Sequence, residues 1–398
     1  MVYVAPGNGG TALDIRLQNV PITDPLALAE FVKQEHIALT VVGPETPLAA
    51  GIVNLFREQG LKIFGPTKEA AQLESSKDFA KAFMKRHAIP TADYQTFSDA
   101  RAAHQYIDEH GAPIVVKADG LAAGKGVVVA MTLSEAHDAI DMMLSDNRFG
   151  DAGARVVVEE FLSGEEASFI VMVDGKNILP LATSQDHKRL YDDDAGPNTG
   201  GMGAYSPAPI VTPELHARVM REIIIPTVQG MAKDGFQYTG FLYAGLMIDD
   251  KGNVKTLEFN CRLGDPETQP IMARLKTDLL SVLEHAVNGT LDTIELEWDR
   301  RTALGVVMAA AGYPDAPRKG DHVIGIPAET SECVTFHAGT TLDNGKLNTS
   351  GGRVLCVVGL GDSVKMAQNH AYHTIEQIHF DGMQFRRDIG WRAIKRRT

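Results

Sequence analysis

Lysines and glycines that could bind phosphate are concentrated in one short stretch, "PIVVKADGLAAGKGVVVA" (residues 113–130). Runs of β-branched residues on both sides predict two strands joined by a glycine-rich turn. Lys117 and Lys125 lie at the two ends of this turn. Ammonium groups and exposed backbone N–H groups both bind anionic oxygens, so the stretch predicts a hairpin that holds a polyphosphate.

The two common nucleotide-binding motifs do not fit this hairpin. The motif G-x-x-x-x-G-K-[ST] leads into a helix, whereas here Gly120 and Gly124 are one residue too close and Gly126 replaces the hydroxyl residue. The dinucleotide motif G-x-G-x-x-G also needs a following helix. The pattern is closer to that of protein kinases, in which a glycine-rich hairpin covers the phosphates and a strand lysine holds them. Taken alone, the stretch could also be a surface hairpin with an incidental lysine.

A second candidate is the strand in "TLEFNCRLGDPETQ" (residues 256–269). Alternation along a strand puts Glu258, Asn260 and Arg262 on one face and Leu257, Phe259 and Cys261 on the other. Carboxylate and amide oxygens are suited to Mg²⁺, and an arginine beside them suits a metal that bridges phosphates. A half-exposed strand with its polar side outward is the alternative.

Two further stretches could complete a nucleotide site. In "VVVEEFLSGEEASF" (residues 156–169), a strand end with Phe161 and Leu162 could enclose a purine, and Glu166 could accept hydrogen bonds from ribose hydroxyls. In "SQDHKRLYDDDAGPNTGGMGAYSP" (residues 184–207), basic residues precede a glycine-rich loop whose backbone N–H groups could reach an anion. The first could equally be an ordinary hairpin and the second a disordered connection.

Composition excludes several classes of function. The 398 residues are enough for two or three domains, and a formal charge of −13 argues against a broad nucleic-acid-binding surface. Three widely spaced cysteines argue against a disulfide framework or a zinc site and favour a reducing cytoplasm. The sequence shows neither a signal-peptide pattern nor an apolar run of membrane-spanning length. These features predict a cytoplasmic multidomain α/β enzyme.

The elements that must position these residues form three regions. Up to about residue 75, strands alternate with helices, which predicts a small parallel sheet. The predicted strands are Val2–Ala5, Leu39–Val42 and Lys62–Phe64, and the predicted helices are Pro25–His36 and Pro47–Gln59. The turn "APGNGG" is expected to lead into an irregular segment, as if the first strand and helix of a doubly wound domain were absent.

The next two regions differ in the helices and strands that their sequences predict. A helix over Ser76–His87 carries Lys77, Lys81 and Lys85 at i, i+4 spacing, and such lysines usually lie on a solvated helix face. Another helix is predicted over Ser134–Ser145. From residue 301 onward, strands dominate, with "HVIGIP" among them, and one late helix covers Ser363–His379.

In order along the chain, these motifs resemble the ATP-grasp superfamily and, within it, the phosphoribosylamine–glycine ligase family. The resemblance covers nearly the whole chain, and "GPNTGGMGAYSP" and "EFNCRLGDPETQ" are its most specific parts. Other stretches that carry it are "APGNGGTA", "VGPETPLAAG", "FGPTKEAAQLESSKDFAK", "KADGLAAGKGV", "EEFLSGEEASF", "SQDHKR", "GFLYAGLM", "GVVMAAAGYP" and "GGRVLCVVGLG".

The resemblance implies an ATP-grasp fold of the α/β and α+β class. A small Rossmann-like domain would cover residues 1–75, the ATP-grasp domain residues 76–300 with a lid subdomain at about 95–165, and a strand-rich C-terminal domain residues 301–398. Family members begin with a strand and a "GGREHA"-type turn and helix that this sequence lacks. The ribose-phosphate site is therefore expected to be incomplete.

The resemblance also implies a reaction and its residues. ATP and Mg²⁺ or Mn²⁺ would drive ligation of glycine to 5-phosphoribosylamine through glycyl phosphate, in a monomer or weak homodimer. The implied catalytic residues are Arg262, Lys188 and Asn198, and the implied metal ligands are Glu258 and Asn260. The implied ATP-binding residues are Lys77, Lys117, Gly124, Lys125, Gly126, Glu159, Phe161, Leu162 and Glu166. The implied substrate-binding residues are Asn8, Gly9, Gly10, Pro44, Glu45, Asp186, Arg189, Thr199, Gly200, Gly201, Gly203, Asp265 and Arg353.

Two rival classes remain open on the sequence. A biotin-dependent carboxylase shares the grasp architecture, but nothing in the sequence resembles its biotin-facing motifs. A nonenzymatic nucleotide-binding module is opposed by the presence of both phosphate lysines, the Glu258–Asn260 pair and Arg262. Another ATP-grasp carboxylate–amine ligase and an ATP-binding protein inactivated by N-terminal truncation are further alternatives.

Overall fold

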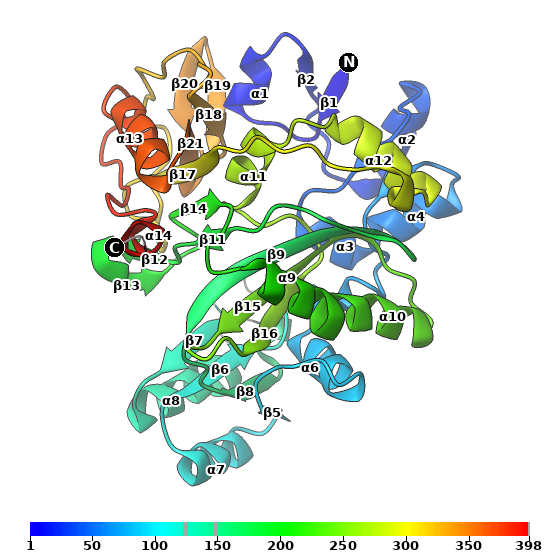
Figure 1. Cartoon of the computed structure of the whole chain (residues 1–398), viewed down its shortest axis with the longest axis vertical. Helices are drawn as coiled ribbons and strands as arrows, with labels where there is room; N and C mark the ends of the chain where they lie inside the picture. Colours follow the sequence, from blue (N-terminus) through cyan, green and yellow to red (C-terminus); the bar gives the residue numbers. More distant parts are fainter. Residues whose placement is uncertain (122–125, 147–149, 397–398) are drawn as a thin grey trace.

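The computed structural model describes residues 1–121, 126–146 and 150–396. Figure 1 shows helices α7 (Ala100–His110) and α8 (Leu133–Ile140) at one end of the long axis, with the N- and C-terminal regions at the other. Between them lies the long antiparallel pair β9 (Glu165–Asp174) and β15 (Thr239–Ile248). Mixed helices and sheets confirm the predicted fold class.

The N-terminal region contains two pairs of parallel strands surrounded by helices. β1 (Val2–Val4) pairs with β2 (Leu17–Asn19), and β3 (Thr40–Val41) pairs with β4 (Ile63–Phe64). The helices are α1 (Gly9–Leu13), α2 (Pro25–Gln34), α3 (Glu45–Ala50), α4 (Ile52–Glu58) and α5 (Gln72–Ser75). The predicted parallel pairing is confirmed, but it occurs in two separate pairs.

Two predictions for this region are wrong in detail. The turn "APGNGG" leads into helix α1 and not into an irregular segment, because the Asn8 side chain accepts a hydrogen bond from the Thr11 N–H and caps the helix. The single helix predicted over Pro47–Gln59 is two helices, because Gly51 adopts a left-handed conformation with φ of +93° and ends the first.

Two antiparallel four-stranded sheets form the middle region, in the orders β10–β9–β15–β16 and β5–β8–β6–β7. We call the second one the lid sheet, because it lies within the range predicted for the lid. The remaining strands are β5 (Tyr94–Phe97), β6 (Ile114–Ala118), β7 (Val127–Ala130), β8 (Val156–Glu160), β10 (Ile178–Pro180) and β16 (Val254–Asn260). An apolar core on α7 and α8 covers one face of the lid sheet.

The middle region also contains seven of the fourteen α-helices in the described part of the chain. Ser76 caps α6 (Lys77–Arg86), as the predicted helix requires. The others are α9 (Pro213–Val219), α10 (Ile225–Lys233), α11 (Thr268–Arg274) and α12 (Leu279–Asn288), with the shorter turns η1 (Asp141–Ser145), η2 (Gly150–Gly153), η3 (Asp192–Asp194), η4 (Met220–Ile224) and η5 (Leu291–Thr293).

A five-stranded sheet in the order β11–β14–β17–β21–β18 organises the C-terminal region. Its strands are β11 (Gln185–Asp186), β14 (Gly203–Ser206), β17 (Thr302–Ala309), β18 (Cys333–His337) and β21 (Arg353–Gly361). The first two come from the glycine-rich stretch 184–207, so that stretch is hydrogen-bonded into the C-terminal sheet. The other elements are β12 (Arg189–Tyr191), β13 (Ala195–Asn198), β19 (Thr340–Asp343), β20 (Lys346–Thr349), α13 (Val364–Ile375) and α14 (Trp391–Lys395).

The stretch "HVIGIP" does not form the predicted strand. His322 and Ile324 make only isolated bridges, to Asn348 and His379. The largest apolar core joins the N-terminal helices, through residues such as Phe56, to the β9–β15–β16 face. Among the residues that the structure describes, no helix is long and apolar enough to cross a membrane.

Candidate active site

A cavity of about 700 Å³ collects most of the predicted site residues from all three regions. The predicted residues that line it are Pro44, Glu45, Lys77, Lys117, Gly126, Glu159, Phe161, Leu162, Glu166, Asp186, Lys188, Asn198, Thr199, Gly200, Glu258, Asn260, Arg262, Asp265 and Arg353. Gly124 and Lys125 lie outside the described residues. Motifs as far apart as residues 44 and 353 thus contribute to one space.

Lys77 stands at the base of the glycine hairpin. It is the first residue of α6, and its Nζ donates to the Gly120 carbonyl oxygen at 3.1 Å. The neighbouring Ser76 hydroxyl donates to Asp119, which anchors the helix start to the end of β6. Burial lowers the pKa of Lys77, and the negative charge of Glu258 opposes this shift. A half-buried ammonium group that lines a cavity is suited to hold an anion.

Lys117 and Lys81 share one carboxylate. Lys117 Nζ lies 3.1 Å and Lys81 Nζ 2.9 Å from Glu159 Oε2. All three side chains are buried. Burial lowers the pKa of Lys81 to about 8, against the opposing charge of Glu159. The expectation of a solvated helix face is therefore wrong for Lys81, which lines the cavity.

Glu159 was expected to contact adenine, and its carboxylate is instead occupied by the two lysines. Oε1 of this group is buried with no hydrogen-bond partner among the described residues. Glu160, the next residue, also lines the cavity and pairs with Lys255 at 2.8 Å. A purine that binds here could therefore contact Glu159 only through its main-chain atoms. The apolar Phe161 and Leu162 also line the cavity.

Strand β16 presents the predicted polar face. Glu258 and Asn260 of β16 line the cavity, as does Arg262 two residues beyond the end of the strand, while Phe259 and Cys261 belong to the largest apolar core. The alternation of polar and apolar residues along β16 is interrupted at Leu257. At this point the pairing of β16 with β15 shifts register, between Gly245 and Leu246 of β15. This bulge exposes the Leu257 carbonyl oxygen, which accepts a hydrogen bond from Lys117 at 3.3 Å.

Arg262 is held between two carboxylates. Its Nη2 lies 3.0 Å from Glu74 Oε1, and its Nε lies 3.4 Å from Glu45 Oε2 without hydrogen-bond geometry. Glu74 also accepts from the Cys261 N–H at 2.7 Å. Burial raises the pKa of Glu74 to about 7 despite the charge of Arg262. Glu74 was not predicted from the sequence, because nothing in "QLESS" separates it from an ordinary helix residue.

Glu166 and Lys188 form an ion pair of 2.5 Å across the cavity wall. Burial favours the neutral form of Lys188, but Glu166 and Asp186 raise its pKa well above the ordinary value. Burial raises the pKa of Asp186, and Lys188 opposes that shift. Lys188 is therefore a fixed positive charge. In this structure Glu166 is engaged by an ammonium group, so a ribose would have to share it.

A buried hydrogen-bond network that the sequence did not reveal lies behind this wall. Glu267 Oε1 accepts from the Ser168 hydroxyl at 2.8 Å and from the Tyr243 hydroxyl at 3.0 Å. Burial raises the pKa of Tyr243. Glu267 and Tyr243 line the cavity. Only the fold brings Ser168, Tyr243 and Glu267 together, because they are distant in sequence.

Arg353 fixes the glycine-rich loop against the cavity. Its guanidinium donates to the Gly200 carbonyl oxygen at 2.7 Å and to the Asp265 carboxylate at 2.7 Å. The Gly200 N–H donates to the Tyr313 hydroxyl, and the Thr199 N–H donates to the Lys188 carbonyl oxygen. These two N–H groups were expected to face an anion and are already hydrogen-bonded within the protein.

Six predicted residues do not line the cavity: Asn8, Gly9, Gly10, Arg189, Gly201 and Gly203. Asn8 donates to the His337 carbonyl oxygen, and a Cβ on Gly9 or Gly10 would meet residues of the C-terminal region. Arg189 donates to the Gly196 carbonyl oxygen within its own hairpin. Gly203 is buried in β14. Their role in binding substrate stays a prediction.

Metal binding at this cavity would depend on Glu258 and Asn260. Within the described residues, no group of three or more His, Cys, Asp or Glu side chains is arranged to hold a metal ion. Burial opposes ionisation of Glu258, but Lys188, Lys117 and Lys77 lower its pKa, so it is a carboxylate at neutral pH. One carboxylate and one amide fit a Mg²⁺ ion that takes its other ligands from phosphates and water.

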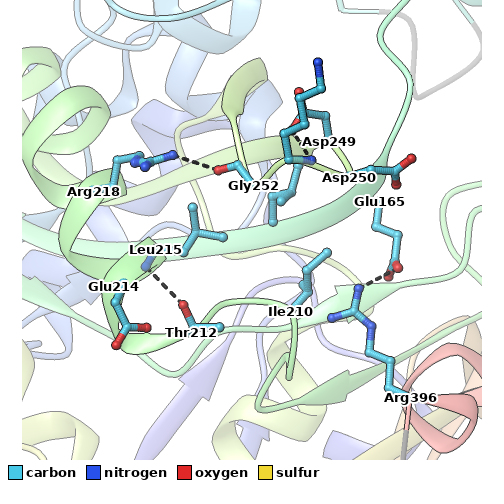
Figure 2. A pocket seen from close by; sticks show the side chains of 12 residues that line it. Glu165, Ile210, Thr212, Glu214, Leu215, Arg218, Asp249, Asp250, Gly252 and Arg396 are labelled. Atoms are coloured by element: carbon cyan, nitrogen blue, oxygen red, sulfur yellow. Dashed lines mark hydrogen bonds and ion pairs between the residues drawn. The ribbon is translucent and has the colours of Figure 1, made fainter.

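A second cavity of about 450 Å³ lies between β15 and α9 (Figure 2). The Glu165–Arg396 ion pair and the hydrogen bond from Arg218 to the Gly252 carbonyl oxygen cross it. None of the predicted site residues that the structure describes lines this second cavity. The chemistry predicted from the sequence belongs to the larger cavity.

Comparisons with known proteins agree along the whole chain. Models of the N domain, the ATP-grasp (A) domain and the C domain of phosphoribosylglycinamide synthetase match residues 1–74, 75–268 and 303–392. A phosphoribosylamine–glycine ligase of Ralstonia nicotianae is 75% identical over 396 residues, covering 100% of this chain and 94% of that protein. The ligase of Neisseria meningitidis is 64% identical over 99% of this chain and 94% of its own length.

Solved structures give the same result. The crystal structure of phosphoribosylamine–glycine ligase from Thermotoga maritima matches with a TM-score of 0.84 and 36% identity, covering 98% of this chain and 93% of that one. The biotin carboxylase domain of a Hydrogenobacter thermophilus 2-oxoglutarate carboxylase matches with a TM-score of 0.72 at 15% identity, over 93% of this chain and 82% of that one. The second likeness shows the shared fold alone.

Proposed function

Because the chain belongs to the phosphoribosylamine–glycine ligase family, we propose that its central cavity performs the family reaction with the residue roles given below. The enzyme is a ligase of purine biosynthesis that forms the carbon–nitrogen bond between glycine and 5-phosphoribosylamine. ATP is converted to ADP and phosphate, with glycyl phosphate as the intermediate.

The observation that carries the residue roles is the convergence of three elements on one cavity. Lys77 from α6, Lys117 from β6 and the polar face of β16 all line it. Phosphoryl transfer needs positioned positive charge more than a protein nucleophile, and this convergence supplies it. Phe161 and Leu162 would enclose the adenine, with main-chain atoms near Glu159 at its polar edge.

In the first chemical step, a glycine carboxylate oxygen attacks the γ-phosphorus and the bond to the ADP oxygen breaks. Negative charge on the transferring group would be balanced by Lys77, Lys117 and Arg262. Glu258 and Asn260 would hold the divalent cation, which neutralises phosphate charge when bound. Glu74 and Glu45 orient Arg262 by the ion pairs described above.

In the second step, the phosphoribosylamine nitrogen attacks the glycyl carbonyl carbon and phosphate leaves, while the nitrogen loses a proton. Lys188, held by Glu166, would stabilise the leaving phosphate. The loop from Asn198 to Gly200 would border the substrates, and Arg353 keeps it against the cavity. The carboxylate of Asp186 lies on the same wall.

The test is ADP release by the purified chain with ATP, Mg²⁺, glycine and phosphoribosylamine, each organic substrate being omitted in turn. Release that requires both substrates and yields glycinamide ribonucleotide supports the proposal. Release with bicarbonate in place of glycine would indicate a carboxylase. Nucleotide binding without any turnover would indicate a binding protein.

A further inference from the structure

Four side chains at the junction of α7 and α8 form a continuous chain, and none of them lines either cavity described above. His104 Nδ1 lies 2.6 Å from His137 Nδ1. His104 Nε2 lies 3.0 Å from Asp141 Oδ1, and His137 Nε2 lies 3.0 Å from Asp108 Oδ1. Each aspartate follows one histidine by four residues along the sequence but bonds to the histidine of the other segment.

The two carboxylates determine where the ring protons lie. An ionised carboxylate can only accept a hydrogen bond, so Nε2 of each ring must carry a proton and donate it. A neutral imidazole has only one N–H group. When both rings are neutral, Nδ1 of His104 and Nδ1 of His137 are therefore both unprotonated nitrogens with a lone pair, and when one ring is protonated a single proton lies between them.

Two lone pairs that face each other at 2.6 Å repel each other unless a positive charge lies between them. A transition-metal ion meets this requirement without changing either tautomer. Zinc–nitrogen bonds of about 2.0–2.1 Å with an angle of about 90–110° place the two nitrogens about 2.9–3.4 Å apart. The rings would have to separate by less than about 1 Å, which partly exposed side chains on two helices can do.

The surroundings have the form that metal-binding histidines require. Such histidines donate their second ring N–H to a carboxylate, which fixes the ring and raises its basicity. Both rings do so here, and the Ser145 hydroxyl donates to Asp141 at 3.4 Å. The side chains of His104 and His137 are 27% and 30% exposed, so water can reach the space between them.

We propose that His104 and His137 bind a divalent transition-metal ion such as Zn²⁺, Ni²⁺ or Cu²⁺ through their two Nδ1 atoms. Water completes the coordination, because within the described residues no third protein ligand joins the pair. Imidazole nitrogen selects these ions over Mg²⁺, which prefers oxygen. The site is separate from the proposed Mg²⁺ position at Glu258 and does not depend on the proposed function.

Binding would join α7 directly to α8, and both helices cover the lid sheet through one apolar core. The expected consequence is a more stable lid in the presence of the metal, since anything that binds only the folded state stabilises it. Turnover is not expected to require the ion.

The experiment is a titration of Zn²⁺ into the full-length protein in excess Mg²⁺, followed by calorimetry. One site is expected in the unmodified protein, and His104→Gln and His137→Gln should each weaken it at least tenfold. His110→Gln is the matched control, because His110 lies on the same helix but bonds only to the Tyr106 carbonyl oxygen. Asp108→Asn should weaken binding by roughly 10–100-fold while leaving both ligands in place.

A Cu²⁺ spectrum by electron paramagnetic resonance provides the second readout. Two nitrogen ligands are expected in the unmodified protein and fewer in His137→Gln. The proposal is overturned if Zn²⁺ binds equally well to the His137→Gln variant or does not bind the unmodified protein. The second result would mean that a shared proton and no metal lies between the rings. Circular dichroism of each variant checks that it is folded.

Discussion

Lys81, Lys117 and Glu159 form a buried group in which one carboxylate faces two ammonium groups. The group carries an excess positive charge inside the protein, which is costly unless an anion comes close. Burial lowers the pKa of Lys81 to about 8, which is the signature of this cost. At the scale of single residues, this group therefore favours a nearby anion, as the proposed ATP site requires.

Replacing Lys117 by alanine should weaken ATP binding, because it removes a charge-assisted contact to phosphate. The expected loss is about 1.5–3 kcal/mol, or roughly 10–150-fold in Kd. The measurement is equilibrium titration of ATP into the folded variant. Lys255→Ala is the matched control, because that lysine pairs with Glu160 and does not line the cavity. Equal affinities for the two variants would remove Lys117 from the site.

Arg262→Ala should reduce kcat on the order of 10²–10³-fold with little change in the Kd for ATP. This pattern follows if the guanidinium acts on charge that develops during phosphoryl transfer. Steady-state kinetics together with ATP titration separate the two effects. Arg318→Ala, which removes a surface arginine paired with Asp321, should leave both unchanged. A rise in KM at constant kcat would assign Arg262 to ground-state binding.

At the scale of elements, strand alternation predicted the face of β16 and failed only at Leu257. A bulge there depends on pairing with β15, and a single strand gives no sign of where its partner shifts register. Helix periodicity likewise placed Lys77 and Lys81 on one side of α6 but did not show that this side meets Glu159. Both failures come from contacts between segments that are distant in sequence. For the same reason, Glu74 and Glu267 could not be identified as site residues from the sequence.

The glycine-rich loop depends on β21 through a single arginine. Arg353→Met should release the Gly200 carbonyl oxygen and the Asp265 carboxylate together, so the loop loses its fixed position. We expect the KM for glycine or phosphoribosylamine to rise roughly tenfold, while that for ATP changes less than threefold. Initial-rate kinetics with each substrate varied provide the measurement. Arg301→Met is the control, since Arg301 pairs with Asp299 away from the cavity. An equal effect on the ATP KM would contradict the assignment.

At the scale of the whole molecule, resemblance predicted the ATP-grasp fold, and the structure shows how its regions are joined. Strands β11 and β14 leave the middle region to enter the C-terminal sheet. Asn8 of the N-terminal region bonds to His337 of the C-terminal region. Region boundaries predicted from the sequence alone could not show these shared strands and contacts, because strand pairing between regions leaves no local sequence pattern.

Arg386 is one of the links between segments, and its side chain is fully buried. It pairs with Asp194 at 2.8 Å and Asp388 at 2.7 Å, joining the C-terminal segment to the β12–β13 hairpin. Arg386→Met should destabilise the protein by about 3–5 kcal/mol, because Asp388 loses its ion-pair partner and Asp194 keeps only Arg392. Urea unfolding of this variant, with Arg318→Met as an exposed control, measures the difference. Equal midpoints would show that the buried arginine contributes no net stability.

Because the pKa of Lys81 is lowered, binding of an anion in the cavity is coupled to proton uptake from the solvent. The pKa of this lysine is about 8, so a fraction of the molecules carries it neutral in mildly alkaline buffer. An arriving polyphosphate favours the ammonium form, so binding must draw protons from the buffer near pH 8. The measured enthalpy of ATP binding should then vary with the ionisation enthalpy of the buffer, and affinity should fall as pH rises through 8. Calorimetry in two buffers at one pH would count the protons, and Lys81→Met should abolish most of the buffer dependence.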